Sequence, residues 1–302
     1  MMLKIYMKQK SNKWILLITV LSLMSCAPVT EIDDREDVDS GSQTGNNSNG
    51  NGNSNVNQNN NSGNNNTQTE VDTLDVLWDC LWAYYPFDDD ANEVVLDKAG
   101  WENPYDGALF GGKYIDDTPD GKGKALMLNG NKEQYVNIPY NIFKDLEKFT
   151  ICFWIKDFET GVVITGINPA YDVSYQQNMH WPKLLMRNDG KISFDAYGEL
   201  YDYNDNCPKF SSYTYTPIQS SGWHHVAVAF DGSTAHLYVD GLVKDNVSAR
   251  FRKTSDGITK VNIGGNGNGS LPVYISMKID NVSVYGAYLG SSYIKYIYRN
   301  LL

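Results

Sequence analysis

The sequence predicts an all-β domain of the sandwich type, carried on a long N-terminal tether. Residues 71–302, about 230 in all, have the size of one all-β sandwich or barrel. This part contains short runs rich in β-branched and aromatic residues, with Pro and Gly between them. Long patterns with a period of 3.6 residues are missing, and only the C-terminal segment SSYIKYIYRNLL has a helical pattern.

The strongest strand signals are short apolar runs bounded by turn residues. We expect strands at FTICFWIK (149–156), KISFDAY (191–197), WHHVAVAF (223–230), AHLYVDG (235–241), KVNIGG (260–265) and IDNVSVYG (279–286).

Three of the four histidines, His224, His225 and His236, lie in one segment, GWHHVAVAFDGSTAHLYVDG. The Asp-Gly turn at residues 231–234 predicts a hairpin. In its register His225 and His236 share a face. His236 pairs with Ala229, however, which lies four residue steps along the strand from His225, roughly 13 Å at about 3.3 Å per residue. Zinc binds nitrogen at about 2.0 Å, so we expect a central hairpin buried on both faces and no shared metal site. The predicted pairs are Phe230 with Ala235, Ala229 with His236, and Val226 with Val239.

The N-terminus has the layout of a bacterial lipoprotein signal peptide over residues 1–25. Four lysines precede the apolar run WILLITVLSLM, which is short for a membrane span. The run ends at Leu23-Met24-Ser25-Cys26, which resembles the lipobox whose cysteine is diacylated. We expect lipidation at Cys26; the alternative is an ordinary signal peptide with a coincidental cysteine.

Residues 26–70 are predicted to be a disordered linker. Its first part, EIDDREDVD, contains six acidic residues and one arginine. Acidic stretches at this place resemble signals that send lipoproteins to the outer face of the outer membrane in Gram-negative bacteria, although a solvated spacer is the alternative. Residues 40–69 are almost wholly Asn, Ser, Gly, Gln and Thr, which cannot form a core. Such a tether reaches on the order of 30 Å.

The charge of the chain argues against nucleic-acid and anionic-lipid partners. Removal of the four lysines in residues 1–25 would take the formal charge from −11 to −15, because −11 minus 4 is −15. A chain this acidic repels both partners. Membrane attachment is therefore expected through acyl chains alone.

Cysteine usage does not predict a disulfide framework. With Cys26 lipidated, Cys80, Cys152 and Cys207 are left, which allows at most one disulfide. Cys152 lies inside a predicted strand, which favours a buried thiol. No CxxC or Cys/His spacing for zinc occurs.

Read in order, five segments resemble the laminin-G-like, concanavalin A-like jelly-roll domains of bacterial surface proteins. The resemblance covers almost all of residues 80–300 and implies a two-sheet antiparallel jelly roll over residues 71–302. Within it, His225 looks like a framework residue beside Trp223. The segments are YYPFDDD (84–90), ALMLNGNKEQYVNIP (125–139), FTICFWIK, GWHHVAVAFDGSTAHLYVDG and KIDNVSVYGAYL (278–289).

Catalysis is not expected, although related jelly rolls include hydrolases and lyases. A retaining glycoside hydrolase needs two carboxylates about 5 to 5.5 Å apart. The nearest acidic group is Asp195, Glu199 and Asp202, where Gly198 breaks the strand. The Gly-x-Ser-x-Gly elbow of α/β-hydrolases is missing.

The leading hypothesis is non-catalytic recognition of a glycan at the cell surface. The alternative is a structural or adhesive surface domain that binds a protein, and a lyase or hydrolase ranks third. Ligand binding is expected on two aromatic-rich insertions, residues 169–181 and 197–215, because loops on a rigid scaffold commonly carry binding. The candidate ligand-binding residues are Tyr175, Trp181, Tyr201 and Tyr203; the alternative is that these rings pack as a lid over the sandwich.

The resemblance also implies a structural calcium ion that joins the two ends of the domain. Asp88 and Asp280 match the two acidic positions of that pattern, and Asn129 could add an oxygen. Calcium takes six to eight oxygen ligands. The alternative is that Asp88 lies in a solvated turn and that Asp280 hydrogen-bonds a neighbouring loop.

Overall fold

The structure is a computed structural model, and its chain divides into two units, Met1–Leu74 and Asp75–Leu302. The residues that it describes are 4–10, 13–19, 65–88, 93–167, 180–195, 211–213, 217–248, 259–265 and 274–300.

The first unit contains an antiparallel strand pair, β1 (Lys4–Lys10) and β2 (Lys13–Thr19). The helix α1 (Asn65–Cys80) begins in this unit and ends in the second. None of the described helices is both long enough and apolar enough to cross a membrane.

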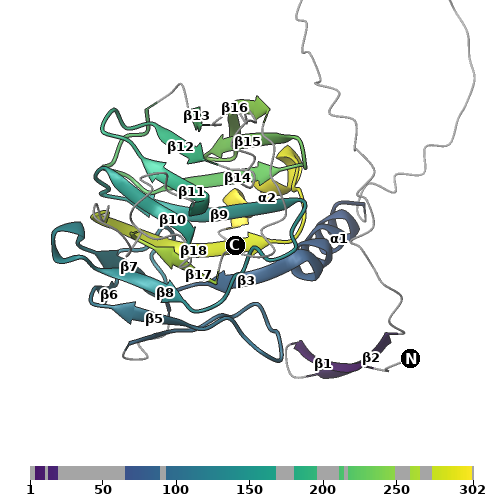
Figure 1. The fold of residues 1–302 in the computed structure, drawn as a ribbon. Coiled ribbons are helices and arrows are strands. Elements are labelled where there is room, and N and C mark those ends of the chain that lie inside the picture. Colours follow the sequence, from purple (N-terminus) through teal and green to yellow (C-terminus); the bar gives the residue numbers. More distant parts are fainter. Residues whose placement is uncertain are drawn as a thin grey trace, which may run out of the picture. The chain divides into compact units, whose positions relative to one another are not determined.

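The second unit is a sandwich of two antiparallel sheets, as the sequence predicts (Figure 1). We name each sheet after a central strand. The β8 sheet has the order β13 (Ser211–Tyr213), β12 (Ile192–Asp195), β11 (His180–Met186), β10 (Gly161–Ile167), β17 (Lys260–Ile263), β8 (Tyr135–Ile138), β5 (Gly107–Phe110), β4 (Val94–Val95). The β9 sheet has the order β16 (Leu242–Ser248), β15 (Thr234–Val239), β14 (His224–Phe230), β9 (Phe149–Lys156), β18 (Met277–Tyr285), β7 (Ala125–Leu128), β6 (Lys113–Ile115), with β3 (Leu81–Tyr85) also paired to β18.

All six strands expected from the sequence are present as β9, β12, β14, β15, β17 and β18. The β14–β15 hairpin has the predicted register: Phe230 pairs with Ala235, Ala229 with His236, and Val226 with Val239. The pair is central, because β14 also pairs with β9.

Two apolar clusters explain why β9 and β14 are buried along almost their whole length. The main core lies between the sheets and includes Phe149, Phe153 and Phe230. A second cluster lies on the other face of the β9 sheet and contains Cys152, Ala227 and Ala229 together with helical residues. Both faces of these strands therefore exclude water, which favours continuous apolar runs over alternation.

Two helices contribute to the second cluster. The predicted C-terminal helix is α2 (Ser291–Asn300), which buries Ile294 and Ile297. The sequence analysis did not predict α1, which buries Leu77 and starts six residues before the predicted domain boundary at residue 71. The first half of α1 is polar, and the apolar pattern of its last turns is too short to predict a helix from the sequence.

Candidate functional site

An open pocket of about 540 Å³ lies on the β8 sheet, at the end of β5 and the start of β8. Three aromatic residues and three charged residues form much of its lining: Phe110, Tyr135, Tyr274, Glu93, Lys132 and Glu133. We call it the Tyr135 pocket. Its volume lies within the range of about 300 to 1,000 Å³ that is typical of small-molecule sites.

The aromatic rings of the pocket form a stacked platform. Phe110 and Tyr135 are nearly parallel, with ring centroids 4.8 Å apart and planes 7° apart. Tyr274 extends the platform, with its ring centroid 5.8 Å from that of Tyr135. Phe110 is 49% exposed. A large aromatic side chain with this much solvent exposure indicates a binding surface more strongly than a small exposed apolar residue does.

Strand alternation places these rings on the outer face of the sheet. Leu109 and Val136 point into the main core, so their neighbours Phe110 and Tyr135 point outward. The β5–β8 register pairs Phe110 with Tyr135, which brings the two rings together. Tyr274 lies against Gly265, where a Cβ atom would overlap its ring. Glycine at this position therefore allows the third ring to approach.

The polar side of the pocket is built by the turn between β7 and β8. The short 3-10 helix η1 (Gly130–Lys132) is followed by its C-cap residue Glu133, which has a left-handed backbone with φ of 55°. The next residue, Gln134, accepts a hydrogen bond from the backbone N–H of Asn129 at 2.9 Å through its side-chain oxygen. Burial raises the pKa of the Tyr274 hydroxyl, and the negative charge of Glu133 raises it further.

None of the ligand-binding residues predicted from the sequence is among the described residues that line this pocket. Tyr175, Tyr201 and Tyr203 lie outside the described residues. Trp181 lies in β11, but its side chain is outside the described part. The acidic residues that were considered for catalysis are also not described: the side chain of Asp195 and the whole of Glu199 and Asp202 lie outside the described part of the chain. Cys26 and Cys207 lie outside it as well.

Of the predicted calcium ligands, Asp88 and Asp280 lie close enough for their charges to interact, and Asp120 joins them. Asp280 is 3% exposed. Burial, together with the charges of Asp88 and Asp120, raises the pKa of the Asp280 carboxyl to about 8, and a hydrogen bond from the Asn281 backbone N–H opposes the shift. The Asp88 carboxylate accepts a hydrogen bond from the backbone N–H of Lys124 at 2.9 Å.

Asn129 lies away from this acidic group. In the β7–β18 register Leu128 pairs with Met277, so Asn129 follows beside Ser276. Ser276 directly precedes β18 and lies four residue steps from Asp280, roughly 13 Å at about 3.3 Å per residue. Within the described ranges, no three His, Cys, Asp or Glu side chains are placed to hold one metal ion.

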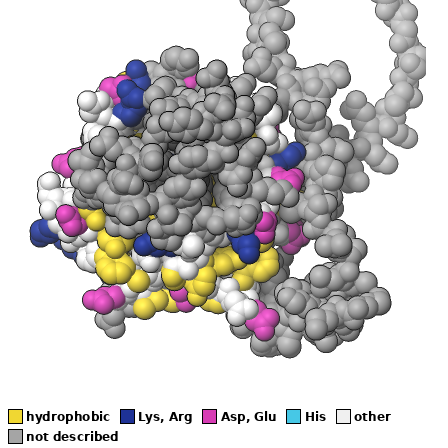
Figure 2. Space-filling view, viewed as in Figure 1, with side chains coloured by type: hydrophobic (Ala, Val, Ile, Leu, Met, Phe, Trp, Pro, Cys, Tyr) yellow, Lys and Arg dark blue, Asp and Glu magenta, His cyan; other side chains and the backbone are white. Residues whose placement is uncertain are grey.

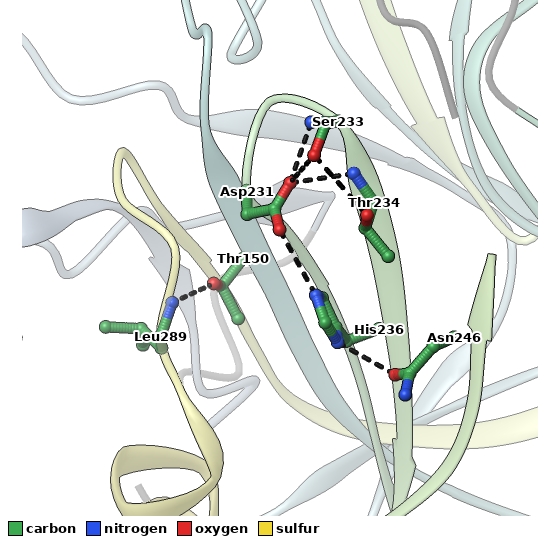
Figure 3. Close-up of polar contacts among 7 residues, drawn as sticks. All are labelled: Thr150, Asp231, Ser233, Thr234, His236, Asn246 and Leu289. Carbon is green, nitrogen blue, oxygen red and sulfur yellow. Dashed lines mark hydrogen bonds and ion pairs between the residues drawn. The ribbon is translucent and has the colours of Figure 1, made fainter. Parts of the chain in front are cut away.

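The three histidines of the β14–β15 hairpin have different surroundings. His236 contacts Asn246 through Nδ1 at 2.8 Å and Asp231 through Nε2 at 3.4 Å (Figure 3). The Asp231 carboxylate also accepts the backbone N–H groups of Ser233 and Thr234, which closes the turn (Figure 3). This arrangement fixes the hairpin.

The other two histidines lie at the far end of the hairpin. His224 contacts Asp240 at 2.8 Å, while His225 is fully buried between the rings of Trp154 and Tyr298. The burial of His225 agrees with a framework residue.

The chain matches a family of known proteins over more than half of its length. Residues 129–295 match the model of the concanavalin A-like lectin/glucanases superfamily. A search of curated proteins found no match to the sequence.

Several solved structures share the fold at low identity. Domain 4 of AbnA, a GH43 extracellular arabinanase from Geobacillus stearothermophilus, in complex with arabinotriose, is 19% identical with a TM-score of 0.55, and the match covers 72% of this chain and 97% of that chain. The binding domain of botulinum neurotoxin DC in complex with SialylT is 11% identical with a TM-score of 0.51, over 74% of this chain and 52% of that chain. Trypanosoma rangeli sialidase is 16% identical with a TM-score of 0.52, over 73% of this chain and 32% of that chain.

Proposed function

Because the chain belongs to the concanavalin A-like lectin/glucanase superfamily, we propose that it is a non-catalytic recognition protein that binds carbohydrate in the Tyr135 pocket. One observation carries the proposal: the half-exposed ring of Phe110 stacks on the partly buried ring of Tyr135, beside charged side chains. The carbohydrate-bound neighbours, which contain arabinotriose and SialylT, support this class of ligand.

The chemistry of the pocket suits a sugar ring. The C–H face of a sugar stacks on an aromatic ring, and the offset Tyr274 offers a second surface. Hydroxyl groups of the sugar need hydrogen-bond partners at the rim. Glu93 and Glu133 supply acceptors there, and Lys132 supplies a donor.

The proposal of a binding role without catalysis is supported by the sequence. Within residues 71–302 the sequence lacks the clustered Glu-x-Asp-x-x-Glu pattern that related hydrolases carry on one strand, and its one match, Glu31 to Glu36, lies in the predicted linker. Incubation with polysaccharides and analysis of the products tests this part, since any new reducing end or unsaturated sugar would contradict it.

We also propose that the protein is a lipoprotein anchored through Cys26 and exposed on the outer membrane. The support is the lipobox-like segment at residues 23–26, directly after an apolar run, and the acidic stretch behind it. A binding domain on such an anchor would meet its ligand outside the cell.

We also propose a calcium ion between Asp88 and Asp280, the two carboxylates that match the family pattern. Their mutual repulsion and the burial of Asp280 raise the pKa of its carboxyl, so a cation there would be favoured. Carboxylate oxygens are the donors that calcium prefers, with carbonyl groups and water completing the shell. When bound, calcium would hold the end of β3 against β18 and add folding free energy.

Affinity measurements on a glycan panel test the proposed function. We expect wild-type protein to bind at least one polysaccharide and Phe110→Ala to weaken that binding. Leu242→Ala is the matched control, because Leu242 is a 56% exposed apolar residue in the other sheet. Binding to no glycan, with capture of one protein partner instead, would favour the alternative adhesive role.

A further inference from the structure

Gln134, which lines the Tyr135 pocket, has a side-chain amide whose orientation is fixed by the protein. Its oxygen Oε1 accepts the backbone N–H of Asn129 at 2.9 Å. An amide oxygen only accepts hydrogen bonds and an amide nitrogen only donates them, so this contact decides which end of the amide faces Asn129. The nitrogen Nε2, with its two N–H groups, therefore lies at the other end.

The amide nitrogen of Gln134 lies next to Gly111, which directly follows β5. Gly111 has a left-handed backbone with φ of 71°, and a Cβ atom there would lie 2.9 Å from Cγ of Gln134 and 3.1 Å from its Nε2. Glycine at this position therefore leaves room for the amide beside Phe110. Among the described residues, none accepts a hydrogen bond from Nε2. The pocket thus offers two N–H donors to a ligand.

Hydrogen bonds hold the turn that carries Gln134 in place before any ligand binds. The backbone carbonyl of Asn129 accepts the N–H groups of Lys132 and Gln134 at 3.1 and 3.3 Å. The N–H of Gly130 donates to the Ser276 hydroxyl at 3.1 Å, which attaches the turn to the segment before β18. Groups fixed in this way lose little conformational entropy on binding.

Glu133 places a negative charge at the pocket. Its left-handed backbone is uncommon for a residue other than glycine, and the hydrogen bond from its N–H to the Gly130 carbonyl at 3.0 Å stabilises it. Such an outlier in the backbone often accompanies a functional site. The charge of Glu133 extends to Tyr274 across the lining, since it adds to the effect of burial on the pKa of that hydroxyl.

The charges of the described lining residues are net negative. Glu93 and Glu133 face one opposite charge, that of Lys132, and all three residues are exposed. The formal charge of the whole chain, −11, has the same sign. Figure 2 shows hydrophobic side chains gathered in a band over the region where Figure 1 draws β5 and β8, with charged side chains of both signs around it. An anionic ligand would therefore meet repulsion on approach.

We propose that Gln134 and Glu133 set the specificity of the Tyr135 pocket, so that it binds a neutral sugar unit and rejects uronic and other acidic sugars. The inference rests on the proposed function and narrows its ligand class. The sugar stacks on Phe110, one of its oxygens accepts the N–H groups of Gln134, and a hydroxyl group donates to Glu133. A carboxylate cannot donate to Glu133 and is repelled by it.

The first experiment tests the donor at constant charge, on the purified chain. Gln134→Glu keeps an oxygen for the Asn129 N–H, replaces the amide donor by a second acceptor and adds one negative charge. The double variant Gln134→Glu with Glu133→Gln has the charge of the wild type without the donor. Both should bind the tightest neutral glycan of a panel about three- to tenfold more weakly than wild type. Glu133→Gln alone keeps an acceptor and should bind it like wild type.

The second experiment tests the rejection of acidic sugars on the same panel. Its neutral members are arabinan, galactan, mixed-linkage glucan and methyl-esterified polygalacturonan, and its acidic members are polygalacturonan, alginate and hyaluronan. Wild type should bind the tightest neutral glycan at least about threefold more tightly than any acidic one, and high salt should reduce this difference because it screens the repulsion. Glu133→Gln should also reduce it, whereas Glu102→Gln, which removes an exposed charge outside the lining, should not.

The outcomes separate this inference from the proposed function. Phe110→Ala should weaken binding of the neutral glycan, and Leu242→Ala should not. If Phe110→Ala weakens binding while the double variant, folded by its melting curve, binds like wild type, or if an acidic glycan binds tightest, the specificity inference is wrong and the pocket stands. If no probe binds, or Phe110→Ala has no effect, the proposed function fails and this inference with it.

Discussion

The carboxylate of Asp117 accepts a hydrogen bond from the ammonium group of Lys278 at 2.6 Å. Lys156 donates to the same carboxylate at 2.9 and 3.0 Å, and the indole N–H of Trp223 donates at 3.1 Å. Asp117 thereby connects the segment after β6 to β9, to β18 and to the residue before β14. Four parts of the β9 sheet meet at one side chain.

Replacing Asp117 by Ala should lower the free energy of unfolding by about 1 kcal/mol. Charged hydrogen bonds contribute about 1.5 to 3 kcal/mol when sheltered, but Asp117 is partly exposed and solvent screens it. Urea unfolding measures the change. Asp116→Ala is the control, since Asp116 is exposed and its ion pair with Lys124 is long, at 3.5 Å. Equal loss in both variants would contradict the role of Asp117.

Asp280 should make the stability of the fold decrease as the pH rises. Burial, with the charges of Asp88 and Asp120, raises the pKa of this carboxyl from 3.8 to about 8. Between these values the folded chain holds a proton that the unfolded chain releases, so stability falls as pH rises from about 4 to 8. Asp280→Asn keeps the acceptor for the Asn281 N–H and removes the titration. Its melting temperature should therefore decline less across this range than that of wild type.

Calcium should reverse the loss of stability at pH 8 if it binds at the same carboxylates. We expect the wild-type melting temperature to rise with calcium and to fall with a chelator, because an ion that binds only the folded state stabilises it. Asp280→Asn and Asp88→Asn should not respond, whereas Asp116→Asn should respond like wild type. Unchanged melting of the wild type in both solutions would leave Asp280 as a hydrogen-bonding framework residue.

Local signals in the sequence predict the β14–β15 hairpin down to its register. The Asp-Gly turn fixes which residues face each other, and nothing further along the chain needs to be known. The order of the family-like segments adds the two-sheet architecture. The hairpin prediction succeeds because it depends on neighbouring residues, and the architecture because the family-like segments occur in order along the chain.

The Tyr135 pocket could not be predicted in the same way. Phe110 and Tyr135 meet only because β5 pairs with β8, and Tyr274 reaches them from a distant segment. Likewise, Asn129 is predicted from the sequence to add an oxygen to the shell of Asp88 and Asp280, but the β7–β18 register separates it from Asp280. The charge of Asp120 does act on Asp280, but Asp120 stands in a turn whose sequence does not mark it as part of a site.

Anchoring should depend on Cys26. If the lipobox is used, Cys26→Ala removes the thiol that receives the lipid, and the chain should lose acyl labelling and leave the membrane fraction or remain uncleaved. Metabolic labelling with a fatty-acid analogue and membrane fractionation measure both effects. Cys80→Ala is the control, because Cys80 lies at the end of α1 within the folded part. Equal labelling of the Cys26 variant would exclude this anchor.

His225 should make the fold sensitive to mild acid. Burial lowers the pKa of its imidazole from 6.5 to about 4, although Asp240 opposes the shift, and neither ring nitrogen has a hydrogen-bond partner among the described residues. Between these pH values the unfolded chain takes up a proton that the folded chain refuses, so this residue contributes a loss of stability as pH falls from 6.5 to 4.

A His225→Phe variant separates this effect from that of Asp280, which acts in the opposite direction over the same range. Phenylalanine keeps a ring between Trp154 and Tyr298 and removes two enclosed polar atoms, so stability at pH 7 should be equal or higher. The free energy of unfolding in urea, measured at pH 7 and pH 5, should fall less on acidification in the variant than in wild type. A variant that loses as much stability as wild type would show that the acid sensitivity arises elsewhere, and a large loss at pH 7 would show that His225 has a hydrogen-bond partner that the buried ring requires.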